Sequence, residues 1–205
     1  MNKQLNTALA SLFLATASMT ATATEENKSG YVGISYGSIS SETGITGLTG
    51  TATLDEDNKG AKLFAGFNVD ENFSIEGFYS NSGEATLSGN NGDRFVDDGV
   101  TYELTTTATV KVEVKSYGLA GVYKLNKINE ITPFVKLGFY KWDADATVNA
   151  GTVSGSASTD GTDTFYGVGL SYPLSDTVNV RTEFERYDLD GYDSDYMSVG
   201  ISQNF

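Results

Sequence analysis

The side chains that could carry chemistry in this 205-residue chain are mostly carboxylates. The chain has 27 Asp and Glu residues against 13 Lys and Arg, and it contains neither His nor Cys. Without His, the usual general base near neutral pH is missing, and neither a Ser–His nor an acid–His catalytic pair can form. Without Cys, thiolate catalysis, cysteine zinc sites and disulfides are excluded as well. We therefore expect no enzyme activity and no cofactor.

One acidic segment has the ligand chemistry that calcium takes. Residues 188–195 read Asp-Leu-Asp-Gly-Tyr-Asp-Ser-Asp. Hard oxygen ligands suit Ca²⁺, but the glycine falls too early for an EF-hand loop and the closing Glu is absent. On ligand type alone, this segment is a candidate calcium site at Asp188, Asp190, Asp193 and Asp195; otherwise it is a solvated acidic loop.

A second group of charges follows a period of two residues. Arg181, Glu183 and Glu185 are separated by single apolar or hydroxyl residues, so on a β-strand they point to one face. If that face lines a narrow barrel, the cations and carboxylates should pair, because an isolated buried charge is costly. If it is the outer face of a soluble sheet, they are simply solvated. We expect the first arrangement, a lumen charge network of Lys62, Glu76, Lys136, Arg181, Glu183 and Glu185, in which Arg181 contacts Glu76 or another carboxylate.

Eight runs of alternating residues would position these charges. Their limits are Tyr31–Ser40, Gly60–Val69, Phe73–Ser82, Val110–Leu125, Ile131–Asp143, Thr164–Leu174, Val178–Asp188 and Tyr196–Phe205. Short connections alternate with longer ones, and an even number of strands puts both termini on the short side. This pattern predicts an all-β fold, an eight-stranded antiparallel up-and-down transmembrane β-barrel with short periplasmic turns and long extracellular loops.

The two faces of these runs differ in composition. One face carries the residues that we expect to meet lipid, namely Val135, Leu137, Val168, Leu170, Val180 and Val199. In the fourth run Val112 and Val114 have one parity while Tyr117 and Leu119 have the other, which leaves a bulge or a change of register open.

Aromatic residues gather near the strand ends. They include Tyr36, Trp142 and Tyr187. Tyr and Trp favour the membrane–water boundary because one end of each side chain is apolar and the other polar. Packing in the core is the other interpretation of these residues.

The first residues have the order of a secretory signal peptide. Lys3 supplies the positive region, Leu5–Ala17 the apolar region, and Ala21–Ala23 an A-x-A cleavage site. We expect residues 1–23 to be the signal peptide and residues 24–205 to be the barrel domain; the alternative is a cytoplasmic helix. Removing Lys3 takes the net charge from −14 to −15.

Several segments resemble the OmpA-like transmembrane domain and the small OmpX-type outer-membrane barrels. Lys141–Asp143 resembles part of the family's fifth strand, Asp160–Asp163 the start of its sixth, and Val180–Tyr187 its charged seventh. The last residues, Ser198, Gly200 and Phe205, resemble the C-terminal signal that the outer-membrane assembly machinery reads, although Gln203 stands where the family usually has an aromatic or apolar residue. The resemblance implies a Gram-negative outer-membrane location.

The function implied is that of a structural outer-membrane barrel whose acidic surface loops mediate interaction at the cell surface, in adhesion, stress tolerance or envelope integrity. A narrow pore for ions or small solutes is the alternative. A secreted barrel that carries an apolar ligand is disfavoured by the charged lumen face. Expected partners are the lipid bilayer, lipopolysaccharide, the assembly machinery, and host or surface ligands at the loops. We expect a monomer that does not bind nucleic acid.

Overall fold

The computed structural model describes residues 30–41, 44–55, 57–97, 99–189 and 191–205. The expected signal peptide lies outside these residues. Among the described residues, no helix has the length and apolar character needed to cross a membrane.

The described chain is built from β-strands. They are β1 (Gly30–Ser41), β2 (Thr53–Asp55), β3 (Asp57–Asn68), β4 (Phe73–Gly89), β5 (Arg94–Asp97), β6 (Val100–Glu103), β7 (Ala108–Lys124), β8 (Thr132–Ala150), β9 (Val153–Pro173), β10 (Val178–Leu189) and β11 (Tyr192–Asn204).

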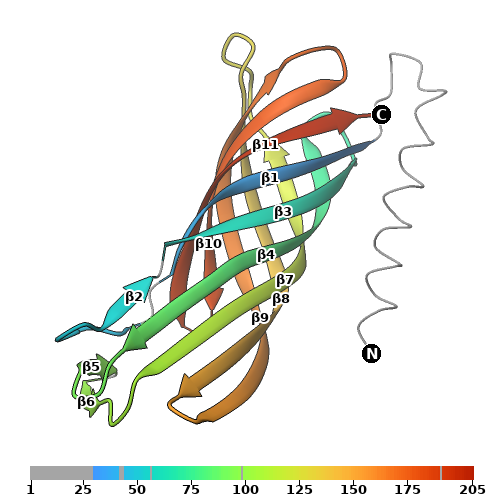
Figure 1. Ribbon diagram of the computed structural model, residues 1–205. Coiled ribbons are helices and arrows are strands. Elements are labelled where there is room, and N and C mark those ends of the chain that lie inside the picture. Colours follow the sequence, from blue (N-terminus) through green and yellow to red (C-terminus); the bar gives the residue numbers. More distant parts are fainter. Residues whose placement is uncertain (1–29, 42–43, 56, 98, 190) are drawn as a thin grey trace.

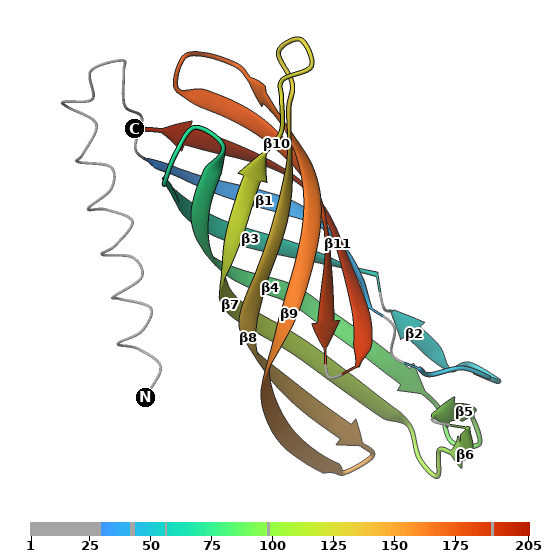
Figure 2. The same cartoon turned by 180° about the vertical axis from the view of Figure 1, so that it is seen from behind.

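Eight of these strands close into a barrel. The neighbours run in the order β4-β3-β1-β11-β10-β9-β8-β7, and antiparallel pairing of β4 with β7 closes the ring (Figures 1 and 2). The described ends of the chain meet at the short-turn end, where Gly30 and Phe205 exchange two backbone hydrogen bonds. Each of the eight predicted runs is one of these strands, so the predicted fold class is confirmed.

Four strands continue past the barrel wall at the long-loop end, further than the sequence pattern indicated. On β9, Val153–Asp160 is exposed on both faces, so the apolar alternation that marks a half-buried strand is lost there. Together with β2, these outer ends form what we call the extracellular sheet, comprising Glu84–Gly89 of β4, Ala108–Val114 of β7, Asp143–Ala150 of β8 and Val153–Asp160 of β9.

The irregularity that the sequence left open lies on β4 and not on β7. β7 pairs with β8 in unbroken register, whereas the β4–β7 register shifts between Asn81 and Glu84. Gly83 adopts a φ of 71°, a conformation that glycine takes at little cost. The Asn81 side chain accepts a hydrogen bond from the Gly83 N–H (2.8 Å) and the Ser82 hydroxyl donates to the carbonyl of Val114 (2.9 Å). The bulge reverses the side-chain parity of β4 where it leaves the barrel.

The outer wall of the barrel is apolar. Leu137 is 69% exposed and Val199 is 60% exposed, and Val135, Val168 and Leu170 also lie on this outward face with large exposed fractions. Buried charged and aromatic side chains fill the interior instead. This inside-out distribution is the one that a membrane barrel requires.

Candidate functional site

The six predicted lumen charges meet in one cluster inside the barrel. They come from four strands and each side chain is at most 6% exposed. Lys62 lies 2.5 Å from a Glu185 oxygen, and Lys136 lies 2.6 Å from Glu76 and 2.5 Å from Glu183. Three cations face three carboxylates, so the cluster is neutral as a whole, which is the condition under which buried ions are tolerated.

Arg181 occupies one end of this cluster. Its guanidinium lies 2.9 Å from Glu76 and 3.0 Å from Glu183. The guanidinium carbon is also 4.4 Å from the ring centroid of Phe64 and 4.7 Å from that of Phe134. Arg181 is therefore held by carboxylates at its nitrogens and by aromatic rings over its plane.

Two tyrosine hydroxyls complete the cluster. Tyr31 donates a hydrogen bond to Glu76 (2.8 Å) and Tyr187 donates one to Glu185 (2.9 Å). These two tyrosines are not among the six residues predicted for the network. Alternation along the strand could have identified Tyr187 from the sequence, since Tyr187 lies on the same strand face as Glu183 and Glu185.

Aromatic rings pack on the extracellular side of the ions. Phe165 and Tyr187 stack with centroids 4.8 Å apart, and Phe78 meets the edge of Phe165 at 5.2 Å. Glycines on the lumen face make room for such rings elsewhere in the barrel; a Cβ atom on Gly169, for example, would overlap the ring of Phe134.

The ions and rings separate two cavities. A cavity of about 510 Å³ opens at the periplasmic end and includes Tyr31, Phe134 and Arg181 in its lining. A cavity of about 60 Å³ near the extracellular end is lined by Tyr140 and Tyr187 among others. The two linings share no residue, and Lys62, Glu76, Lys136, Glu183 and Glu185 belong to neither.

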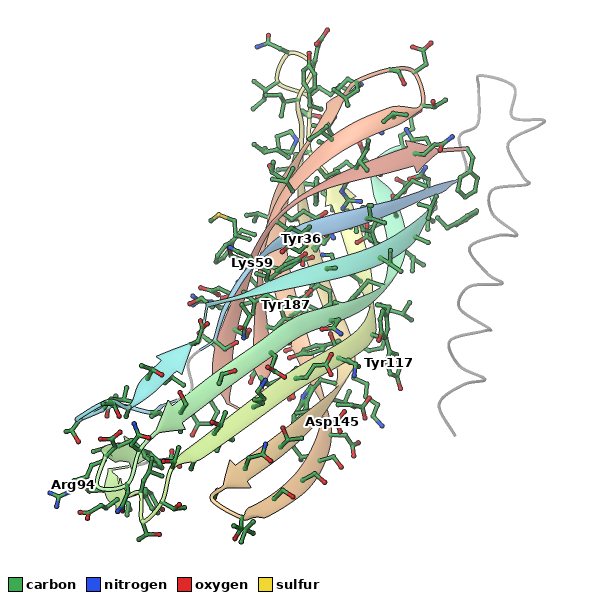
Figure 3. All side chains as sticks on the ribbon, viewed as in Figure 1. Tyr36, Lys59, Arg94, Tyr117, Asp145 and Tyr187 are labelled. Atoms are coloured by element: carbon green, nitrogen blue, oxygen red, sulfur yellow. The ribbon has the colours of Figure 1, made fainter. Side chains whose placement is uncertain are left out.

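Two aromatics that the sequence analysis placed near the membrane boundary lie in the core, which was the other interpretation. Trp142 is 5% exposed and its indole N–H donates to Asp163 (2.7 Å), while Tyr187 is 9% exposed. Tyr36, in contrast, is 61% exposed on the outer wall (Figure 3). Phe67, another aromatic near a strand end, is 60% exposed.

The candidate calcium ligands are partly engaged by a cation. Arg186 binds both carboxylate oxygens of Asp195, at 2.6 and 2.7 Å, and lies 3.1 Å from Asp193. The hydrogen bonds from Arg186 hold the pKa of the Asp195 carboxyl below its ordinary value. Asp188 accepts a hydrogen bond from the Gly191 N–H. Within the described residues no group of three acidic side chains is placed to hold a metal ion; Asp190 lies outside them, so calcium binding stays a prediction.

The residues of the expected assembly signal lie on β11 and just after it. Ser198 is buried on the lumen face, opposite Glu183. Gly200 shares this parity and lies opposite Arg181, and Gln203 is exposed on the outer face. Their recognition by the assembly machinery stays a prediction.

At the other end, the described parts of loop 1, between β1 and β3, and loop 2, between β4 and β7, meet around Asp93, which is 7% exposed. Its carboxylate accepts hydrogen bonds from the Thr51 N–H and hydroxyl and from the Asn90 N–H. These hydrogen bonds, from the Asn90 N–H first, lower the pKa of the Asp93 carboxyl. Thr46 and Val96 exchange backbone hydrogen bonds nearby. The sequence alone did not predict this contact between the two loops.

A closed antiparallel barrel with an apolar outer wall and a charged, filled interior defines the class of outer-membrane β-barrel proteins. Residues 8–205 match the family model described as "Outer membrane protein beta-barrel domain". The chain therefore belongs to this family, and its place is the cell outer membrane. No curated protein matches the chain.

Solved structures show the same fold at low sequence identity. Ail, the attachment invasion locus protein of Yersinia pestis, has a TM-score of 0.51 at 18% identity, covering 86% of this chain and 99% of that chain. Its complex with the heparin analogue sucrose octasulfate has a TM-score of 0.52 at 16% identity, with the same coverage. Neisserial surface protein A has a TM-score of 0.53 at 13% identity, covering 86% of this chain and 97% of that chain.

Proposed function

We propose that this protein is a structural outer-membrane barrel that mediates surface interaction, chiefly adhesion, through a free β-edge outside the cell. The outer part of β9 carries the proposal. Val153–Thr164 pairs with β8 along its whole length, whereas β10 pairs with β9 only from Phe165 onward. No described strand pairs with the other side of this segment, which leaves a row of backbone N–H and C=O groups for a partner strand.

The side chains of this edge favour close approach. The segment reads Val-Ser-Gly-Ser-Ala-Ser-Thr-Asp-Gly-Thr-Asp-Thr, and residues 153–160 are all exposed. Natural edges are usually protected by Lys, Pro or a bulge, and this segment has no Lys or Pro and an unbroken register with β8. Its first carboxylate, Asp160, is paired with Lys141 at 3.1 Å. An extended segment of a partner can therefore add to the sheet as a strand.

The edge is also held away from the membrane on a continuous ladder. β8 pairs with β7 up to Ala150 opposite Ala108, so the β8–β9 hairpin is supported from one side as it projects past the barrel (Figure 3). The name of Ail, an attachment and invasion protein with this fold, is in line with such a role. The pore alternative has less support, because the ion cluster and the aromatic rings lie between the two cavities.

A pair of lysine substitutions tests this proposal. Ser156 on the free edge and Thr147 on β8 are register partners, so a lysine at either position adds the same charge at the same height. Ser156→Lys should block strand addition, since an edge lysine opposes pairing, while Thr147 already has a paired strand on each side. Cells displaying each variant are measured for attachment to immobilised extracellular-matrix protein. We expect Ser156→Lys to lose most attachment and Thr147→Lys to keep it; equal attachment by all three proteins rejects the edge as the binding element.

A further inference from the structure

The β5–β6 hairpin at the tip of loop 2 presents an exposed pair of stacked aromatic rings. Phe95 and Tyr102 are register partners, with ring centroids 5.4 Å apart and planes 20° from parallel. Tyr102 remains 46% exposed. In a stacked pair outside the core, each ring covers one face of its partner, and the other face stays accessible to a ligand.

A carboxylate shares the face of these rings. Asp97 and Val100 are register partners two residues along each strand from Phe95 and Tyr102. Because side chains alternate along a strand, both pairs point to the same side of the hairpin. Val100 is 53% exposed and extends the apolar surface toward the tip. The cation of the hairpin, Arg94, lies on the opposite face, where it pairs with Glu103 at 2.6 Å. Among the described residues of β5 and β6, the aromatic face therefore carries a negative charge and no positive one.

This face is held in place before any ligand arrives. The hairpin is tied to loop 1 by the Thr46–Val96 backbone pair and by the Thr49 N–H, which donates to the carbonyl of Arg94 (3.0 Å). Asp93 fixes the base of the hairpin through its bonds to Thr51. Because this surface is already ordered, binding a ligand there requires less loss of conformational entropy in the loops.

We propose that the Phe95–Tyr102 face binds a Lys- or Arg-rich segment of a protein partner. A cationic side chain lies over the ring faces, where the ring quadrupole attracts it, and its charged end pairs with Asp97. Charge complementarity supports this occupant, because the chain carries a net charge of −14 and draws cationic partners toward its loops. The inference rests on the proposed surface interaction, but it assigns that interaction a site separate from the β9 edge (Figure 1).

The test uses the full-length protein in nanodiscs and a fluorescent nonapeptide of alternating Arg and Gly, with affinity measured by anisotropy at 150 mM salt, roughly the ionic strength that screens distant charges. Tyr102→Leu keeps an apolar side chain but removes the π-face, and it should weaken binding about 3- to 10-fold, as expected for a cation–π contact. Tyr102→Phe keeps the π-face and should restore affinity.

A matched pair of charge variants separates a local site from general attraction. Asp97→Asn removes a carboxylate from β5, and Asp145→Asn removes one from the outer part of β8. Asp145 lies on a different extracellular element from the β5–β6 hairpin, which is marked by Arg94 (Figure 3). We expect Asp97→Asn to weaken binding severalfold and Asp145→Asn to change it less than about twofold, because a screened distant charge contributes little. Heat-modifiable electrophoresis verifies that every variant folds.

Three outcomes overturn the inference: unchanged affinity in Tyr102→Leu, equal losses in the two Asn variants, or binding of a neutral oligosaccharide at this face in place of the peptide. Ser156→Lys should leave peptide binding intact. If Ser156→Lys abolishes cell attachment while no variant of the hairpin affects peptide binding, the adhesion proposal stands and the hairpin site fails.

Discussion

The membrane part of the barrel and the extracellular sheet keep the same inward face on each strand, but the outward face changes from apolar to polar between them. On β8, the outward face carries Leu137, which is 69% exposed in the membrane part, and then Asp145 and Thr147 in the extracellular sheet. On β7, Leu119 is 48% exposed to the lipid side, whereas Val114 packs inward against the core. Neither strand changes register between these residues.

The difference lies in the solvent that surrounds each region. Within the bilayer, apolar side chains favour the outer wall, which meets lipid, and the charges are paired inside. Beyond it, water surrounds the wall and apolar side chains turn inward, as in a soluble protein. Alternation identifies which residues share a face, and the position along the membrane normal decides which face is apolar.

The largest effect should come from comparing an arginine buried in the lumen with one at the extracellular end of the barrel wall. Arg181→Ala leaves the buried Glu76 and Glu183 short of a cation, and we expect it to cost about 3–5 kcal/mol of unfolding free energy. Arg186→Ala breaks ion pairs at a half-exposed site and should cost about 1 kcal/mol or less. Urea unfolding in lipid vesicles measures both, and conductance in planar bilayers shows whether losing Arg181 opens the lumen. Equal costs for the two variants would contradict the difference in environment.

The next effect concerns the outer wall. Leu137→Arg places a charge against lipid and should cost about 2–4 kcal/mol if the site lies near the bilayer midplane. Thr147→Arg, on the outward face of the same strand in the extracellular sheet, should stay within about 0.5 kcal/mol of the parent protein, as surface substitutions usually do. Reversible folding into lipid measures both values. A negligible cost at Leu137 would refute the inside–outside assignment.

A smaller effect is expected at the junction of the two regions. Gly83→Ala forces a residue with a Cβ atom into a φ of 71°, which should cost about 1–2 kcal/mol, and the added atom also lies 2.6 Å from the carbonyl oxygen of Lys59. Hydrogen exchange should accelerate in Glu84–Gly89 and change little in the membrane part of β4. Uniform acceleration along β4 would show that the bulge does not separate the two regions.

The smallest effect is a pH dependence confined to the loops. The pKa of Asp93 is lowered in the folded protein by the hydrogen bonds that it accepts. Its contribution to loop order is therefore complete above the ordinary carboxyl pKa and is lost as pH falls through the lower, folded value. NMR signals of the Thr51 and Asn90 amides should shift in that acidic range, while those of the lumen strands stay unchanged. Asp93→Asn should remove the transition.

The sequence predicted the fold because every barrel strand has one face in lipid and one in a packed lumen, which produces alternation. The sequence also predicted that the six lumen charges lie together, because residues such as Lys62, Glu76 and Arg181 fall on the polar face of their alternating strands. It did not predict the extracellular sheet, because segments such as Val153–Asp160 are exposed on both faces and show no period. The contact of Asp93 with Thr51 could not be predicted for another reason, because it joins residues of two different loops that are 42 positions apart in the sequence.

The position of Trp142 has a practical consequence. It is the single tryptophan of the chain, and it lies inside the barrel with its indole bound to Asp163. Its fluorescence during refolding should therefore report when β8 and β9 close around the lumen and not when the outer wall enters the bilayer. Quenchers attached to lipid acyl chains should leave its emission nearly unchanged in the folded protein. Tyrosine emission, or a tryptophan introduced at Tyr36 on the outer wall, would be needed to follow membrane insertion itself.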